Sequence, residues 1–420
     1  MKSPTWLCLL AFLVSGTARA ETSLVAITFA AEKASNLLTA TQSQEKVAES
    51  AVAVAKGDYL PHLEADFADT GGFPGSSSSM GIGGLVGSPY RSGPGAGLIA
   101  TTTLWDFGRT SASVHAADHL WEAQKSQTQL AQIDVDSLAA RLFFDCARYE
   151  SQLVAWTQMY TETRIVSGEV ERFVKTGQRS IVERYLSQAQ LAEALTNQTD
   201  FAEKLRLAER KLQVLTRMPL ELLQCPSLVV AEKQIQPSPA AVENPILTRA
   251  NHTAEAAQDQ VDATRADFLP KLKAFAGVGA LENSRLVSKQ DYALGVGVTF
   301  PLFDGFKTLN GLEGARAYAF EKEKLINAAQ DQIDLTNAQF EQVIESSMTR
   351  LSHLHDEQTL ADEGFKVAKS RYFSMQGNLI DLREALRNLM RVRSETIDTQ
   401  AQYDLAVVEQ NLFNGKIAKK

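Results

Sequence analysis

Two long stretches of the chain repeat apolar positions at spacings of three and four residues. The first extends from about residue 110 to 174 and the second from about 308 to 374, and neither contains proline. This period places the apolar side chains along one face of a helix, as in coiled coils. Each stretch therefore predicts one helix about 100 Å long.

Shorter helices are predicted around these two long ones. Their expected ranges are 24–58, 180–217, 243–268 and 379–413. Stacked end to end, the first two together are about as long as helix 110–174, and the last two match helix 308–374. We therefore expect two short helices beside each long one, lining a cylinder of uniform height.

Strands are predicted where apolar and polar residues alternate after Pro61 and Pro270, because proline is tolerated at the start of a strand. The first hairpin combines a strand beginning at Leu63 with a second strand at about 96–105, across the Gly- and Ser-rich loop 71–95. The second hairpin has a strand from Leu272 to Val278 and a polar connection at 281–291. Its last strand alternates apolar with small or polar residues, as transmembrane barrel strands do. We predict that its lipid-facing residues are Leu294, Val296, Val298 and Phe300.

These segments occur twice in the same order. Tyr59-Leu60-Pro61-His62-Leu63 is echoed by Phe268-Leu269-Pro270-Lys271-Leu272, and Leu104-Trp105-Asp106-Phe107-Gly108 by Leu302-Phe303-Asp304-Gly305-Phe306. A repeat of about 200 residues is too long for a solenoid unit and indicates duplicated halves. We expect a first repeat at 21–217, a proline-rich connector at 218–242 and a second repeat at 243–415.

The first twenty residues are typical of a secretory signal peptide. Lys2 precedes a short apolar run, and Ala18-Arg19-Ala20 forms a cleavage site. No later stretch approaches the roughly 18 apolar residues of a transmembrane helix. Loss of Lys2 and Arg19 changes the net charge from −8 to −10, which argues against nucleic acid as a partner.

Candidate chemistry is sparse. Cys146 and Cys225 remain after signal cleavage, and extending the helix axis past its end places them roughly 25 Å apart, too far for a disulfide. We therefore expect a buried thiol and a free loop thiol. His115 and His119 share a helix face, but we expect no third metal ligand nearby, and His353 and His355 flank an apolar stripe residue. With no catalytic motif either, the sequence predicts no enzyme, cofactor or metal.

Four strands per chain cannot close a barrel, and open sheet edges do not survive in a bilayer. The chain must therefore assemble, with eight, twelve or sixteen strands for a dimer, trimer or tetramer. In its duplicated hairpins, its Leu-Pro-x-Leu strand entries and its two helix bends, the chain resembles the TolC-type outer-membrane efflux proteins. The first bend runs from Arg172-Phe173 through Gly177 to Ile181, Glu183 and Ala189-Gln190. The second runs from Arg371-Tyr372 through Gly377 to Ile380, Asp381 and Leu382.

The resemblance implies a homotrimer in the outer membrane of a Gram-negative bacterium. Each chain would contribute four strands to a twelve-stranded β-barrel and its helices to a long periplasmic α-helical barrel. The implied partners are outer-membrane lipid, a periplasmic adaptor (membrane fusion) protein and an inner-membrane pump of the RND or ABC type. The bends would form the tip that docks on the adaptor, comprising Thr176, Gly177, Gln178, Arg179, Ser180, Gln376, Gly377, Asn378 and Leu379.

A gate of two acidic residues three positions apart follows the second bend in some family members. Asp381 and Glu384 have that spacing, although Gly377 falls one position late and the distance to the acids is shortened. The alternative is that both are ordinary solvated helix charges. For the whole chain we predict a passive efflux or secretion duct. The alternatives are a dedicated channel for type I protein secretion, or a periplasmic coiled-coil scaffold without a pore.

Overall fold

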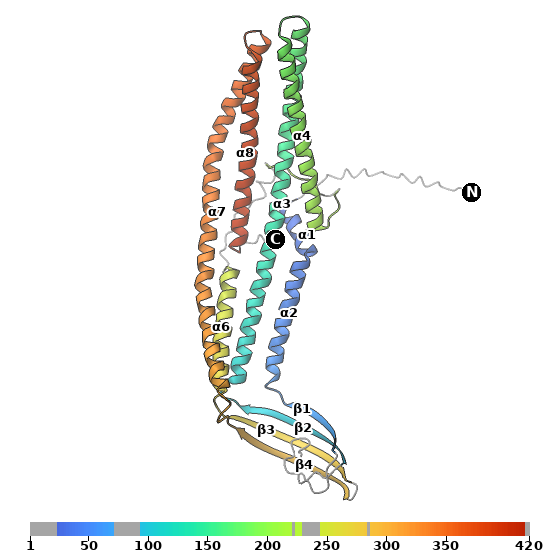
Figure 1. Cartoon of the computed structure of the whole chain (residues 1–420), viewed down its shortest axis with the longest axis vertical. Coiled ribbons are helices and arrows are strands. Elements are labelled where there is room, and N and C mark those ends of the chain that lie inside the picture. The colour runs from blue at the N-terminus through green and yellow to red at the C-terminus, as the bar shows by residue number, and fades with distance from the viewer. Residues whose placement is uncertain (1–22, 71–92, 221–222, 229–243, 284–285, 416–420) are drawn as a thin grey trace, which may run out of the picture.

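The computed structural model describes residues 23–70, 93–220, 223–228, 244–283 and 286–415. The predicted signal peptide, loop residues 71–92 and connector residues 229–243 lie outside the described residues. The described chain is an elongated rod with the strands at one end and two helix bends at the other (Figure 1). Among the described helices, none is long and apolar enough to cross a membrane.

The two halves have matching elements. The first contains α2 (Asn36–Gly57), β1 (His62–Thr70), β2 (Gly93–Trp105), α3 (Arg109–Lys175) and α4 (Ile181–Thr216). The second contains α6 (Pro245–Ala266), β3 (Lys271–Asn283), β4 (Leu286–Thr299), α7 (Lys307–Phe373) and α8 (Leu379–Phe413). Helices α3 and α7 have 67 residues each, and α2 and α6 have 22 each. The predicted long helices are confirmed.

Short helices lie end to end beside the long ones, as expected (Figure 1). Where α8 ends and α6 begins, the Asn244 side chain donates a hydrogen bond of 3.0 Å to the Phe413 carbonyl. The same side chain caps α6 by accepting from the Ile246 N–H at 3.0 Å. One amide therefore fixes the junction between two helices that are far apart in sequence.

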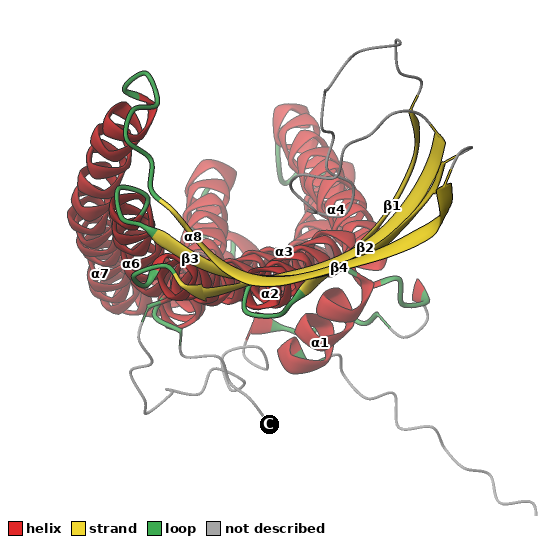
Figure 2. Cartoon of the chain, turned by 90° about the horizontal axis from the view of Figure 1, so that it is seen from below, coloured by secondary structure: helices red, strands yellow, loops and turns green. Residues whose placement is uncertain are grey.

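The helix predicted at 24–58 is interrupted, which corrects the sequence expectation. It divides at Ser35 into α1 (Leu24–Ala34) and α2. Ser35 has an extended backbone, and its hydroxyl accepts from the Leu38 N–H at 3.1 Å, so it serves as the N-cap of α2. Helix α1 then lies on the convex side of the curved wall formed by the other elements (Figure 2).

The four strands form one antiparallel sheet in the order β1-β2-β3-β4. Strands β2 and β3 join the two halves, so that Val278 pairs with Leu98 on one side and with Tyr292 on the other. The predicted polar connection at 281–291 is wrong, because β3 extends to Asn283 and β4 begins at Leu286. The two strands remain paired through these polar residues because strand pairing uses hydrogen bonds between backbone groups, whatever the side chains are.

Each long helix begins at a duplicated cap. Oδ2 of Asp106 accepts from the N–H and hydroxyl of Thr110 at 2.9 and 2.6 Å. Asp304 and Thr308 form the equivalent pair at the start of α7. The two residues after each aspartate have positive φ in both halves, in the order Phe-Gly before α3 and Gly-Phe before α7. These motifs therefore turn the chain sharply from strand into helix.

Cys146 and Cys225 form a disulfide, contrary to the expectation of two free thiols. Their Cα atoms are 5.5 Å apart. The error lay in extending the axis of α4 beyond its end. Arg217 adopts a left-handed conformation, and the chain then turns back along α3, where the Leu228 N–H donates to the Ser151 hydroxyl at 3.1 Å. The start of the connector is thus bonded to the middle of α3.

Candidate functional site

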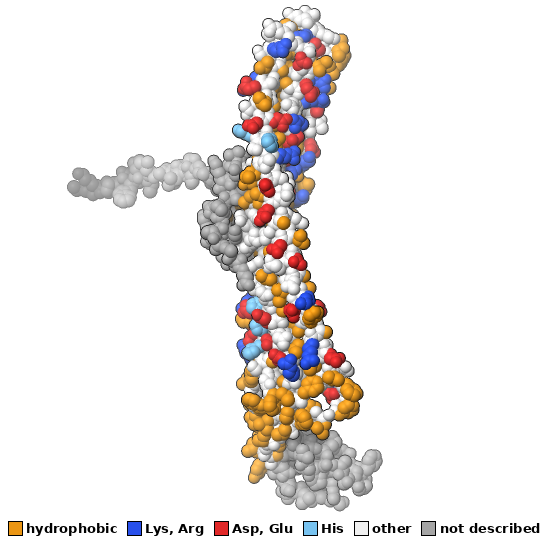
Figure 3. All heavy atoms as spheres, turned by 90° about the vertical axis from the view of Figure 1, so that its left-hand side faces the viewer, with side chains coloured by type: hydrophobic (Ala, Val, Ile, Leu, Met, Phe, Trp, Pro, Cys, Tyr) orange, Lys and Arg blue, Asp and Glu red, His pale blue; other side chains and the backbone are white. Residues whose placement is uncertain are grey.

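The sheet presents one continuous apolar face to its surroundings. The side chains of Leu294, Val296 and Val298 in β4, and of Phe300 directly after it, are all more than half exposed. The pairing register brings apolar residues of the other three strands onto the same face. Hydrophobic side chains gather accordingly at the strand end of the molecule, whereas charged side chains are spread over the helices (Figure 3). The other exposed apolar residues of this face include Leu63, Phe67, Leu98, Val278 and Tyr292.

An exposed apolar face spanning a whole sheet is unusual for a protein surrounded by water. The opposite face carries small residues, among them Gly295 and Gly297 in β4. The Phe275 ring covers Gly295, where an added Cβ would lie 2.7 Å from the ring, whereas Gly297 has open space around it. The two faces therefore differ as the alternation in the sequence predicts, and assignment of the apolar face to lipid remains a prediction.

Aromatic residues surround the junction between strands and helices, a feature that sequence analysis overlooked. Trp105 packs edge-on against Phe107 with ring centroids 6.0 Å apart, and Phe303 packs against Phe306 at 5.5 Å. All four side chains are exposed. Aromatic girdles of this kind flank the apolar band of membrane barrels. The sequence does contain a signal for this feature, because aromatic residues occur in both of the duplicated segments, 104–108 and 302–306.

The first bend connects α3 to α4. Gly177 has φ of +72°, a left-handed conformation that strains other residues. The Gln178 N–H donates to the Phe173 carbonyl at 2.8 Å, as in a Schellman motif, and the Ser180 hydroxyl caps α4. Gly177 therefore supplies a backbone conformation that the turn requires.

The second bend, between α7 and α8, has the same geometry with different residues. Met375 takes the left-handed position with φ of +64°, and Asn378 caps α8, so the spacing from left-handed residue to cap is three in both bends. Gly377 has another role. A Cβ at this position would lie 3.2 to 3.3 Å from the backbone and Cβ atoms of Arg371 and Tyr372. Gly377 thus stands later in its bend than Gly177 does because close packing requires a glycine there. The turn itself lies at the same distance from the following helix in both bends.

Contacts across the tip join the two helical hairpins. The Arg179 guanidinium donates to the Gly377 carbonyl at 2.6 Å and lies 3.8 Å from the Glu183 carboxylate. The Tyr372 hydroxyl donates to the same carboxylate at 2.7 Å. Burial, together with this hydrogen bond to Glu183, raises the pKa of Tyr372, so the phenol stays a neutral donor. The sequence places Glu183 and Tyr372 in the two bends, but nothing in it indicates that the two side chains pair.

Six of the nine predicted tip residues are exposed, and three are not. Thr176, Gly177, Gln178, Ser180, Gln376 and Asn378 are exposed, and Gly377 is half-buried. Leu379 is buried in the core below the bends, and the Arg179 side chain is directed toward the other hairpin. Leu379 and Arg179 therefore support the tip from within.

Asp381 and Glu384 are both exposed on the first turns of α8. Asp381 also has a local structural role. Its backbone N–H donates to the Asn378 side chain at 2.8 Å, and its carboxylate accepts from the Asn378 amide at 3.0 Å. This reciprocal arrangement resembles a capping box. Their role as a gate remains a prediction.

Comparison with known proteins agrees with this geometry. Residues 237–411 match the outer membrane efflux protein family. The alkaline protease secretion protein AprF of Pseudomonas aeruginosa is 33% identical over 130 residues, which is 30% of this chain and 27% of that relative. The chain thus aligns with only about a quarter of this curated relative.

Solved structures of similar fold extend over almost the whole chain. A crystal structure of CusC aligns with a TM-score of 0.81 and 16% identity, covering 94% of this chain and 92% of that one. The outer membrane protein VceC of Vibrio cholerae gives a TM-score of 0.80 and 17% identity, covering 93% and 96%. The open-state outer membrane channel MtrE of Neisseria gonorrhoeae gives 0.78 and 18%, covering 93% and 88%. In sequence, residues 237–411 thus match the outer membrane efflux protein family, and in fold almost the whole chain is similar to outer-membrane channels of the TolC type.

Proposed function

We propose that the chain forms the homotrimeric exit duct of a tripartite efflux or secretion system, through which substrates pass without chemical change. The observation that carries the proposal is the four-stranded sheet with one apolar face and two open edges, at β1 and β4. In a bilayer, unpaired backbone groups at such edges cost several kcal/mol each. Pairing β4 of one copy with β1 of the next removes both edges.

Three copies are the assembly that the fold supports best. Two copies would supply eight strands, whose interior is filled by side chains, whereas twelve strands leave room for a lumen. The likeness in fold to outer-membrane channels likewise favours an assembly that has a lumen. The helices of three copies would then continue the barrel as a tube about 100 Å long.

The proposed docking surface for a periplasmic adaptor consists of the exposed bend residues Thr176, Gly177, Gln178, Ser180, Gln376 and Asn378. They lie at the end of the rod farthest from the sheet (Figure 1). An inner-membrane pump of the RND or ABC type would supply the energy, and the cross-hairpin contacts of Tyr372 and Arg179 would hold the entrance narrow before docking.

A second candidate is a dedicated protein secretion channel. It is favoured by one observation, the 33% identity with a protein named for alkaline protease secretion. Deleting the gene in its host separates the candidates. Sensitivity to small toxic compounds would indicate efflux, whereas loss of a specific protein from the culture medium would indicate secretion.

The duct itself is tested with detergent-extracted outer-membrane protein. Light scattering should give a protein mass of three chains, and planar bilayers should show discrete conductance steps. A protein recovered as a monomer from the soluble periplasmic fraction, without conductance, would instead support the scaffold without a pore.

A further inference from the structure

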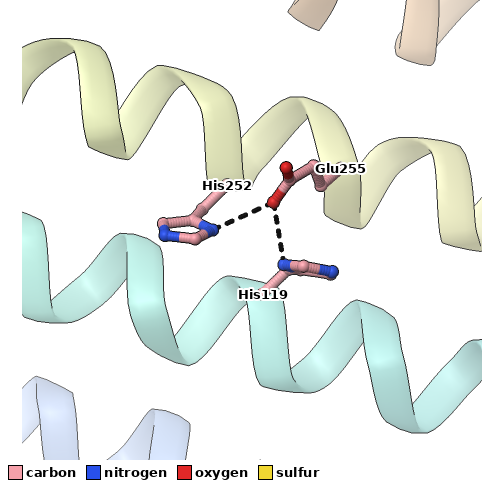
Figure 4. A group of neighbouring side chains, drawn as sticks. All are labelled: His119, His252 and Glu255. Atoms are coloured by element: carbon pink, nitrogen blue, oxygen red, sulfur yellow. Dashed lines mark hydrogen bonds and ion pairs between the residues drawn. The ribbon is translucent and has the colours of Figure 1, made fainter.

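Helices α3 and α6 bring together a group of side chains that the proposed duct does not use. His119 lies on α3, and His252 and Glu255 lie one helical turn apart on α6. Figure 4 shows the two imidazole rings and the carboxylate pointing toward one another in the space between the helices. The expectation that no third ligand lies near His119 is therefore wrong, because its neighbours come from a segment more than a hundred residues away in sequence.

The distances within this group suit coordination of one ion. Oε2 of Glu255 lies 3.0 Å from Nδ1 of His119 and 3.0 Å from Nδ1 of His252. One ligand atom from each of the three residues lies within 4.8 Å of the others. Ligands about 2 Å from a tetrahedral Zn²⁺ are separated from one another by about 3.3 Å. Small side-chain rotations would therefore place all three atoms around one cation.

A further carboxylate is positioned to support the group. Oδ2 of Asp259, one turn beyond Glu255 on α6, lies 3.6 Å from Nε2 of His119. A histidine that binds a metal through one ring nitrogen commonly presents the other to a carboxylate, which fixes the orientation of the ring. Nδ1 of His119 is then left free to face Glu255 and His252.

The chemistry of the donors indicates the class of ion. Two imidazole nitrogens and one carboxylate oxygen favour a first-row divalent transition metal such as Zn²⁺ over Mg²⁺ or Ca²⁺, which prefer oxygen ligands. The side chains of His119 and His252 are 35% and 27% exposed. The group is thus accessible to ions from solvent, and water can complete the coordination shell.

We propose that His119, His252 and Glu255 form a binding site for a divalent transition-metal cation of the Zn²⁺ type, with Asp259 as a positioning residue. The ion would join α3 of the first repeat to α6 of the second, near the point where both helices meet the sheet. A cation at this point would also offset the negative charges of Glu255 and Asp259, which lie against the rings of His119 and His252. The site is independent of what the duct transports.

The test uses the full assembled protein with any purification tag removed, treated with chelator and then titrated with Zn²⁺ or Co²⁺. We expect one ion per chain, visible absorption bands of bound Co²⁺, and a higher thermal unfolding midpoint with Zn²⁺ than with chelator. The double variant His119→Ala/His252→Ala should weaken binding about 100-fold or more, and Asp259→Asn about tenfold.

The matched control is His353→Ala/His355→Ala, which removes two exposed histidines of α7. This variant should bind the ion as the wild type does. Absence of stoichiometric Zn²⁺ or Co²⁺ binding by the wild-type protein would overturn the proposal. Equal binding by the wild type and His119→Ala/His252→Ala would also overturn it. Because the thermal shift is measured on the wild type, the proposal remains testable if a variant fails to assemble.

Discussion

The hydroxyl of Tyr372 on α7 donates a 2.7 Å hydrogen bond to the carboxylate of Glu183 on α4. This bond joins the two helical hairpins at the tip, where Tyr372 is fully buried. Replacing Tyr372 with Phe keeps the ring packed against Phe173 and removes only the bond. Loss of a hydrogen bond to a charged group costs about 1.5–3 kcal/mol. If the bond holds the entrance narrow, Tyr372→Phe should raise single-channel conductance in planar bilayers.

Tyr185→Phe is the control for this change, because Tyr185 lies on α4 close to the same tip but is exposed. It should leave conductance at the wild-type value. If Tyr372→Phe also conducts as the wild type does, the bond does not restrict the entrance.

The exposed bend residues are expected to dock the adaptor, and Gly177→Trp tests this. The substitution places a large side chain on the docking surface at a residue with φ of +72°, where any side chain is strained by about 1–2 kcal/mol. The assembled protein should remain at wild-type level in the outer membrane while export by the native host is lost. Gly168→Trp, a change at a helical glycine in α3 with open space around it, is the comparison. Normal export by Gly177→Trp would place docking elsewhere.

The apolar sheet face is expected to contact lipid. An arginine on the lipid face of a barrel costs roughly 2–4 kcal/mol at the middle of the bilayer. Val296→Arg should therefore reduce the amount of assembled protein in outer-membrane fractions. Gly297→Arg changes the adjacent residue on the other face, where there is open space, and should have the milder effect. Equal losses in both variants would contradict the assignment of the faces.

Much of the fold could be predicted because apolar periodicity alone specifies long helices. The predicted range 379–413 agrees with α8, and 110–174 agrees with α3 within a residue at each end. The break at Ser35 escaped this reasoning, because serine occurs both within helices and at their caps. Only the Ser35 hydroxyl's contact with the Leu38 N–H distinguishes the two uses.

Contacts between distant segments could not be predicted, because they depend on where the chain turns. The Cys146–Cys225 disulfide requires the reversal after Arg217, and the neighbours of His119 require the packing of α6 on α3. The pairing of Tyr372 with Glu183 likewise depends on how the two hairpins align at the tip. In each case the residues were visible in the sequence, but their partners were set by tertiary structure.

Asp136 on α3 should make stability depend on pH. Burial, followed by the neighbouring Glu32 carboxylate, raises the pKa of Asp136 from 3.8 to about 7. The native state therefore holds a proton that the unfolded chain releases near pH 4, and its stability falls as pH rises toward 7. Each pKa unit corresponds to about 1.4 kcal/mol, so the loss between pH 5 and pH 7 is about 2–3 kcal/mol.

Asp136→Asn removes this titration. The variant should lose less stability than the wild type between pH 5 and pH 8, and should have the higher thermal unfolding midpoint at pH 8. Asp134→Asn, a change at an exposed neighbour on the same helix, should follow the wild-type profile. Parallel profiles for wild type and Asp136→Asn would show that Asp136 does not hold the proton.

Asp381 and Glu384 are expected to narrow the entrance to the duct. In a trimer, three copies of each exposed carboxylate would surround one axis and produce a strongly negative potential there. Such a ring should favour cations and bind multivalent cations that block the pore from the periplasmic side. The double variant Asp381→Asn/Glu384→Gln should lower cation selectivity and relieve block by a trivalent cation in planar bilayers.

Its comparison, Glu321→Gln/Glu323→Gln, removes the same charge from exposed residues of α7 near the end of that helix farthest from the bends. If both double variants change selectivity equally, the effect belongs to the overall surface charge. If Asp381→Asn/Glu384→Gln changes neither selectivity nor block, the two carboxylates lie away from the axis and serve α8 only as helix charges.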